Sequence, residues 1–467
     1  MLTYNFGCVF LSNPAFILGM LDRTGEIYES YSMAIRDLFR KNIPEEIPKE
    51  RFILSIDGGG MRGVIPAVIL NAITTQLEEA GDRRPLYAHF DLIAGTSTGG
   101  LLALALAAPV EKTNLPLDSR FISYIYEQGE PSLADRLWGR KPPKNLKGTL
   151  PFGIEISALE KLYLNHGKEI FPKNQGRIFS QIFTDKYDSE PLERYLKKTF
   201  GTIPLSDAVV PLLLMTYDVA NGRPFPLSSR DNHEYLFWEA GRATSAAPTY
   251  FKPAYLYDRQ EETMQTLIDG GLIANNPALF AYIEAKKLYP NAKKFHILSI
   301  STASSDFGFS ISGAGSGVIG WIDPAKGTPI QKIYAGSQLQ AVDAIAAEIP
   351  DLSYTRIHGA LGDQIRLDST SSSALATMRE KAMHIFRDHQ ESIDAYVAML
   401  KRRTSFDQLT LGPKEVESLL GAPKKELPRP AEEDDLATRA AGLSSYYSFL
   451  ARYNIDDDPE DKEGILL

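Results

Sequence analysis

The sequence is poor in cysteine and has fewer basic than acidic residues. One cysteine, Cys8, occurs among 467 residues, which excludes a disulfide within the chain and argues against a cysteine-based zinc site. A reducing compartment such as the cytoplasm fits this cysteine content best. Lysine and arginine number 50 against 59 aspartates and glutamates, and the formal net charge of −9 argues against a nucleic-acid-binding surface.

Long apolar runs are absent as well. The longest uninterrupted run, residues 101–108, is far shorter than the roughly 20 residues that cross a bilayer. Near the start, the apolar stretch 6–21 is broken by Ser12, Asn13 and Pro14, and no basic segment precedes it, so we expect no signal peptide. The sequence therefore predicts a cytoplasmic protein whose contact with a membrane is at most peripheral.

Residues 90–106, FDLIAGTSTGGLLALAL, predict a strand, a sharp turn and a buried helix. Ser97 lies at the apex of the turn in a G-x-S-x-G pattern, between Gly95 and Gly99. A serine held on a tight strand-to-helix turn needs neighbours without side chains, which explains this spacing. Ser97 also lies at a helix N-terminus, where N–H groups and the helix dipole favour a developing negative charge. The alternative is a glycine-rich turn before a core helix.

A second glycine-rich loop lies earlier in the chain. Residues 51–56, RFILSI, predict a buried strand that runs into DGGGMRG at residues 57–63, and a helix with one apolar face follows. This order of elements predicts a parallel α/β sheet with both loops at the carboxyl ends of strands. Successive N–H groups in such a loop form an anion-binding concavity.

The same loop satisfies the G-x-G-x-x-G pattern of dinucleotide-binding proteins, and Glu78 and Glu79 follow about 20 residues later. These glutamates fall on the predicted helix, whereas a ribose-binding acid belongs at the end of the next strand. That next strand leads to Ser97 instead. An oxyanion hole is therefore the favoured interpretation of the loop, with a dinucleotide-dependent enzyme as the alternative.

A third stretch, LIDGGLIANNPA at residues 267–278, places Asp269 between an apolar segment and a Gly-Gly turn. A nucleophilic serine needs a base within hydrogen-bonding reach. His296 would complete a triad in the chain order serine, aspartate, histidine. It lies within the predicted strand 295–300, however, where a histidine is more often part of the core. The other interpretation is a dyad in which the Asp269 carboxylate takes the proton from Ser97.

Four stretches together resemble the patatin-like phospholipase family. DGGGMRG, GTSTG, RATSAAPTYF and DGGLIANNP occur in the order and spacing of that family, over roughly residues 51–302. The resemblance implies a three-layer α/β/α fold with a mainly parallel central sheet. It also implies hydrolysis of acyl esters of phospholipids and related lipids, with release of fatty acid.

The resemblance further implies which residues act. It carries over a dyad of Ser97 and Asp269 without histidine, supported by Gly95, Gly99 and Gly271. It implies an oxyanion hole formed by backbone groups of Gly58, Gly59, Gly60 and Met61, with Arg62 near the site. No metal and no cofactor are implied. The family usually has a glycine-threonine-glycine turn after the late strand, and Ser301, Thr302 and Ala303 stand in its place here.

The flanking regions lead to an expected division into three parts. These are a helical lead-in at residues 1–50, a catalytic domain at residues 51–322 and a mainly helical C-terminal region at residues 323–467. Residues 307–322, FGFSISGAGSGVIGWI, mix glycines with large apolar side chains, which suits a lid or a lipid contact. A folded loop that completes the core is the alternative.

The favoured function is a lipid acyl hydrolase of the phospholipase A or lysophospholipase type. Its partner would be a phospholipid or another acyl-ester lipid, reached through peripheral membrane contact and without nucleic acid. A ligand- or lipid-sensing module that has kept the fold but has little turnover is the alternative. The sequence predicts no oligomeric state.

Overall fold

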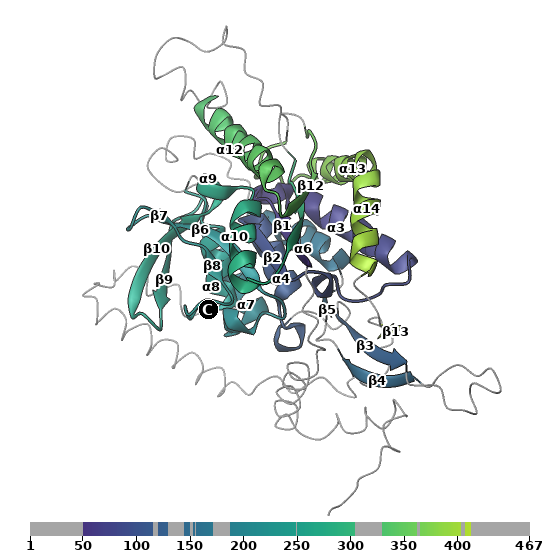
Figure 1. Cartoon of the computed structure of the whole chain (residues 1–467). Coiled ribbons are helices and arrows are strands. Elements are labelled where there is room, and N and C mark those ends of the chain that lie inside the picture. The colour runs from purple at the N-terminus through teal and green to yellow at the C-terminus, as the bar shows by residue number, and fades with distance from the viewer. Residues whose placement is uncertain are drawn as a thin grey trace, which may run out of the picture. The chain divides into compact units, whose positions relative to one another are not determined.

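The computed structural model describes residues 50–114, 120–128, 144–149, 153–154, 156–170, 187–248, 250–303, 329–361, 365–402 and 407–411 (Figure 1). All of them fall within Met1–Val416, the first of two compact units. The expected lead-in up to residue 49, the glycine-rich stretch 307–322 and the tail beyond residue 411 lie outside the described residues.

One large mixed sheet forms the centre of the fold. Its main path runs through β12 (Leu352–Ile357), β11 (Lys294–Ile300), β1 (Glu50–Ile56), β2 (Leu92–Thr96), β6 (Leu212–Asp218), β10 (Thr263–Asp269) and β9 (Ala254–Asp258). The first five of these strands are parallel, and the last two are antiparallel to their neighbours. Two short strands, β7 (Arg223–Pro224) and β8 (Leu227–Ser228), also pair with β6.

Both faces of the sheet are covered by helices (Figure 1). Along β1, Leu54 and Ile56 belong to one hydrophobic cluster and Ile53 to the other, because successive side chains of a strand point to opposite faces. The first cluster includes residues of α3 (Val64–Glu79), α4 (Thr98–Ala107), α6 (Ile156–Ile170), α7 (Glu190–Phe200), α8 (Phe237–Thr244), α13 (Ser372–Asp388) and α14 (Gln390–Arg402). The second includes residues of α9 (Gly271–Ala274), α10 (Ala278–Leu288) and α12 (Pro329–Glu348). The expected three-layer α/β/α fold with mostly parallel strands is confirmed.

The C-terminal part of the described chain contains three helices and also a strand that the sequence did not indicate. Within the expected mainly helical region 323–467, the described residues form α12, α13 and α14, and β12 is a parallel strand beside β11; α13 and α14 pack in the same cluster as α3. One compact unit therefore continues past the expected boundary at residue 322. Because β12 is a six-residue strand with only its first and last residues buried, its sequence lacks the apolar run that marks the other parallel strands.

A smaller sheet contains β3 (Arg120–Gln128), β4 (Lys144–Thr149), β5 (Gly153–Ile154) and β13 (Asp407–Leu411). Its strand β4 lies where the basic composition of residues 140–153 is typical of a loop, because pairing with β3 overrides local composition. Within the ranges given above, no helix combines the length and the apolar character needed to cross a membrane.

Candidate active site

Ser97 stands at the turn between β2 and α4. Its backbone φ of 53° and ψ of −124° are rare for a residue other than glycine, and the residue is half-buried. A Cβ on Gly95 would overlap the backbone of Gly99, and a Cβ on Gly99 would overlap the Ile56 carbonyl. These close approaches account for the glycine spacing around the serine.

Thr244 holds this turn, a role that sequence reasoning missed. The Ser97 N–H donates to Thr244 Oγ1 at 3.0 Å, and the same hydroxyl donates to the Met215 carbonyl of β6 at 2.8 Å. Thr244 lies in the RATSAAPTYF stretch, which the sequence marked as part of a motif. Its role in holding the serine turn becomes visible only from its hydrogen bonds. Thr96 adds a second tie, since its hydroxyl donates to the Ala274 carbonyl at 2.7 Å.

Asp269 lies at the end of β10, level with the serine turn. In the sheet Thr96 is paired with Met215 and Asp269 with Thr216, the next residue of the same strand β6. The Ser97 side chain lies near enough to the Asp269 carboxyl group to lower its pKa, and the Gly271 N–H donates to Asp269 Oδ1 at 2.7 Å. The register of the sheet thus brings together two residues that are far apart in the sequence.

The carboxyl group of Asp269 is poised near neutral pH. Only 5% of the residue is exposed, and burial raises its pKa to about 6, against the lowering effects of the Ser97 side chain and the Gly271 N–H. A carboxylate with a pKa near 4 is a weak base for a serine hydroxyl, whereas one near the working pH suits proton transfer. The geometry therefore places a carboxyl group suited to proton transfer beside Ser97.

The glycine loop follows β1 and leaves two N–H groups uncommitted. The Gly58 N–H donates to the Asn275 carbonyl at 3.0 Å, and the Met61 N–H donates to the Leu367 carbonyl at 2.7 Å. Neither Gly59 nor Gly60 has a backbone acceptor for its N–H among the residues that the structure describes. The N–H groups of Gly58 and Met61, expected as oxyanion donors, thus anchor the loop, whereas those of Gly59 and Gly60 have no backbone acceptor among the described residues.

The carbonyl of Gly58 is fixed by two side chains. Thr302 Oγ1 donates to it at 2.6 Å, and Asn275 Nδ2 donates to it at 3.3 Å. Thr302 lies in the turn where Ala303 replaces the expected glycine, and Ala303 has a φ of 57°. Ala303 thus adopts the left-handed conformation that glycine favours, although alanine carries a Cβ. This backbone conformation is strained for alanine.

Arg62 supports the other end of the loop. Its Nε donates to the Ile365 carbonyl at 3.2 Å, and its Nη2 donates to the same oxygen. Because Leu367 accepts from Met61, the segment around residues 365–367 is tied to the loop at two points. This geometry favours a loop-holding role for Arg62 over the role of a surface cation paired with an acid on its own helix.

Comparisons with known proteins identify the family of this chain. A family model described as Patatin-like phospholipase matches residues 54–282. Patatin-like protein 1 of Arabidopsis thaliana is 30% identical over 324 residues, which cover 63% of this chain and 69% of that protein. The chain belongs to the patatin-like phospholipase family.

Further patatin-like relatives match at a similar level. Patatin-like protein 2 of Oryza sativa subsp. indica is 29% identical over 333 residues, covering 64% of this chain and 73% of that protein. A Solanum tuberosum protein named Probable inactive patatin-3-Kuras 1 is 25% identical over 323 residues, covering 62% of this chain and 75% of that protein. Because one relative carries that name, membership of the family does not by itself establish turnover.

The patatin family model spans all three segments of the candidate site, from within β1 to within α10. It contains the glycine loop, Ser97 and Asp269. It ends before Thr302 and before the whole of β12. Contacts that these later residues make with the glycine loop therefore lie outside the matched stretch.

His296 lies away from this patatin-like site. It pairs with Phe52 near the amino ends of β11 and β1, stacks on that ring with centroids 4.7 Å apart, and lies 3.2 Å from Glu50. Ser97 follows the carboxyl end of β2, so the triad interpretation is not supported. His358 does lie at the carboxyl edge, after β12, where its Nδ1 is 3.0 Å from Ser301 Oγ.

The dinucleotide interpretation also lacks support from the geometry. Glu78 and Glu79 lie in the last turn of α3, a helix of 16 residues and therefore about 24 Å long that starts at the glycine loop. They cannot reach a ribose bound at that loop.

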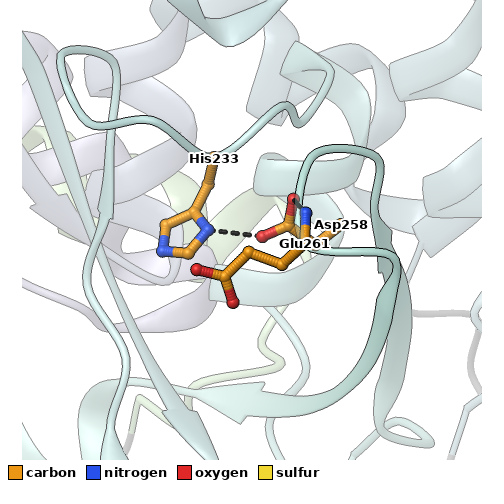
Figure 2. Close-up of side chains that lie close together, drawn as sticks. All are labelled: His233, Asp258 and Glu261. Atoms are coloured by element: carbon orange, nitrogen blue, oxygen red, sulfur yellow. Dashed lines mark hydrogen bonds and ion pairs between the residues drawn. The ribbon is translucent and has the colours of Figure 1, made fainter.

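A separate group of potential metal ligands consists of His233, Asp258 and Glu261, whose ligand atoms lie within 4.8 Å of one another (Figure 2). Asp258 is buried, and its Oδ1 already accepts from the N–H groups of Gln260 and Glu261 at 3.0 and 3.2 Å. Its Oδ2 bonds the His233 ring and accepts from the Tyr235 hydroxyl at 3.4 Å. Both carboxylate oxygens of Asp258 are thus already engaged, Oδ1 by the turn between β9 and β10 and Oδ2 by His233 and Tyr235.

Proposed function

We propose that this protein is a serine acyl-ester hydrolase that acts on lipid esters. The observation that carries the proposal is the position of Ser97, on its strained turn, beside the buried carboxyl group of Asp269, whose pKa is raised to about 6. The uncommitted N–H groups of Gly59 and Gly60 supply the third part of the arrangement. Nucleophile, base and anion-binding donors are the parts that acyl transfer requires.

In the proposed reaction, Ser97 Oγ attacks the ester carbonyl carbon and its proton passes to Asp269. The carbonyl oxygen becomes an oxyanion that accepts from the N–H groups of Gly59 and Gly60. Collapse of this intermediate breaks the bond to the alcohol, which leaves with the proton from Asp269. A water molecule then gives a proton to Asp269 and attacks the acyl-serine carbonyl carbon. Collapse of this second intermediate breaks the bond to Ser97 Oγ, which takes the proton from Asp269, and fatty acid is released.

The proposed substrate class follows from membership of a family described as Patatin-like phospholipase. A phospholipid or another acyl-ester lipid fits, and a cytoplasmic location with peripheral membrane contact belongs to the same proposal. A net charge of −9 disfavours attraction to anionic head groups, so that contact would rest on apolar side chains.

The test compares wild type with Ser97→Ala and Asp269→Asn on a short-chain nitrophenyl ester and on phospholipid vesicles. Both variants should lose hydrolysis to a similar extent, because members of one catalytic unit are not additive. A fluorophosphonate probe should label wild type at Ser97. Ser337→Ala, on the exposed side of α12, is the matched control and should behave as wild type.

Hydrolysis that survives in Ser97→Ala would refute the proposal. Lipid binding by wild type without turnover and without labelling would also refute it and would favour the sensing module.

A further inference from the structure

Arg356 and Asp57 form a buried ion pair directly beneath the glycine loop. The guanidinium of Arg356 comes from β12, and its Nη1 and Nη2 donate to Asp57 Oδ1 and Oδ2 at 2.8 and 2.6 Å. Their side chains are 12% and 2% exposed. Such a two-point contact fixes the orientation of the carboxylate as well as its position.

Asp57 is the residue that joins β1 to the glycine loop. Its N–H donates to the Ile300 carbonyl of β11 at 3.0 Å, so backbone and side chain are held from two neighbouring strands. The next residue, Gly58, has both its N–H and its carbonyl committed, and Gly59 and Gly60 follow. The direction in which the two uncommitted N–H groups point is therefore set from Asp57 onward.

The pair is part of a polar network that also reaches the Asp269 side of the site. Arg356 Nη1 donates to Ser299 Oγ at 2.8 Å, and Ser299 Oγ donates to Asn276 Oδ1 at 3.3 Å. Asn276 Nδ2 in turn donates to the Tyr354 hydroxyl at 2.8 Å. Asn276 follows the turn that carries Asp269, so one network connects the loop of the oxyanion donors with the loop of the base.

Stability alone is a poor explanation for this pair. Removing two charges from water costs about as much as their attraction returns, so a buried ion pair is weak evidence of net stabilisation. Burial raises the pKa of Asp57, and the Arg356 guanidinium opposes that rise. The two-point contact places the positive charge of Arg356 against the Asp57 carboxyl group, next to the place where an oxyanion would form.

We propose that Arg356 is a positioning residue for the oxyanion hole, which acts by fixing Asp57 and by compensating its charge. This inference rests on the proposed function for its effect on turnover. Without the guanidinium, the start of the loop loses its side-chain anchor, and Gly59 and Gly60 no longer meet the oxyanion in a fixed orientation. Preorganised donors lose most of their effect when they must be oriented during the reaction.

The experiment compares Arg356→Gln and Arg356→Lys with Arg84→Gln. Arg84 is the matched control, because it also forms a two-point pair with a buried aspartate, Asp82, at 3.0 and 2.8 Å and with 14% and 6% exposure. That pair precedes β2 and so lies at the opposite edge of the sheet from the glycine loop. Four quantities are measured for each variant: kcat and KM on a short-chain ester, the melting temperature, and the rate of hydrogen–deuterium exchange of backbone amides.

Arg356→Gln should lower kcat by about 10- to 100-fold with little change in KM, which is less than the loss of a whole oxyanion donor. Arg356→Lys should retain part of kcat, because lysine keeps the charge but not the planar fork. The amides of Asp57, Gly58 and Met61, which are hydrogen-bonded in the structure, should exchange faster in Arg356→Gln. Arg84→Gln should lower the melting temperature and leave kcat and these amides unchanged.

The inference is overturned if Arg356→Gln loses no more kcat than Arg84→Gln and the three loop amides keep their protection. If Arg356→Gln does not fold, kcat and the exchange of the three loop amides are measured on Arg356→Lys, and the same criterion applies. If wild type hydrolyses no ester, the proposed function fails, and unchanged exchange of the loop amides would then overturn the positioning role as well. Faster exchange in that case would support the role of Arg356 in fixing the loop.

Discussion

Asp269 is expected to govern the acid side of the pH profile. With a pKa of about 6, the carboxyl group is ionised in about 9% of molecules at pH 5 and in about 90% at pH 7. An unperturbed aspartate would be more than 90% ionised at both values. Because the base form takes the serine proton, kcat/KM of wild type should fall about tenfold between pH 7 and pH 5.

The same titration makes Asp269 costly for stability. Its pKa is higher in the folded chain than the ordinary value of 3.8, so the ionised form is less favourable in the folded than in the unfolded state. A difference of about two pKa units corresponds to about 3 kcal/mol. This cost is absent below the unfolded pKa of 3.8, grows as pH rises from that value toward the folded pKa of about 6, and is nearly complete at about pH 7.

Asp269→Asn removes this cost, because the amide cannot ionise and its Oδ1 can still accept from the Gly271 N–H. The variant should therefore be inactive yet more stable than wild type, by up to about 3 kcal/mol at pH 7 and by about 0.5 kcal/mol at pH 4. Urea unfolding at pH 4, 5, 6 and 7 gives the difference in the free energy of unfolding between the two proteins.

Ser97→Ala is the matched control for this experiment. It is also expected to be inactive but keeps the Asp269 carboxyl group. The difference in free energy of unfolding between Asp269→Asn and Ser97→Ala should therefore depend on pH in the same way as the difference between Asp269→Asn and wild type. Two results would refute the reasoning: wild-type kcat/KM that stays constant from pH 7 to pH 5, or an Asp269→Asn variant whose stability follows that of wild type at every pH.

Three further outcomes are expected. Ala303→Gly should raise the free energy of unfolding by about 1 kcal/mol, since it relieves the left-handed conformation, whereas Ala281→Gly within α10 should lower it; chemical denaturation distinguishes the signs. Gly60→Ala should lower kcat by about 10²- to 10³-fold, because the added Cβ would overlap the Leu367 carbonyl. Gly81→Ala is the control: Gly81 has a φ of 86° and open space around it, so this variant should keep wild-type kcat, and an equal loss of kcat in both variants would contradict a site-specific effect. His296→Gln should keep kcat if it folds, and a folded but inactive variant in a steady-state assay would argue against the dyad.

Local patterns were sufficient for the parts of the site whose geometry is local. A strand running into a glycine-bounded serine and a helix leaving it predicted the turn at Ser97. The sequence placed Asp269 after an apolar segment, and the structure shows that this segment ends the strand β10. The strands that the sequence marked by continuous apolar runs, at residues 51–56 and 295–300, coincide with β1 and β11 within one residue at their first positions. Buried parallel strands carry such runs because both of their faces are covered.

Tertiary structure alone decided the features that depend on contacts between distant residues. Asp57 and Arg356 are 299 positions apart, and β12 lacks the apolar run that would predict a strand. The sequence therefore predicted neither the ion pair nor its position at the glycine loop. The sequence predicted four loop N–H groups as oxyanion donors but did not show which of them donate to other parts of the chain. In the structure the Asn275 and Leu367 carbonyls accept from Gly58 and Met61, so the N–H groups of Gly59 and Gly60 remain without a backbone acceptor among the described residues. A motif fixes which groups are available along the chain, whereas sheet register and packing fix which of them remain unpaired at the site.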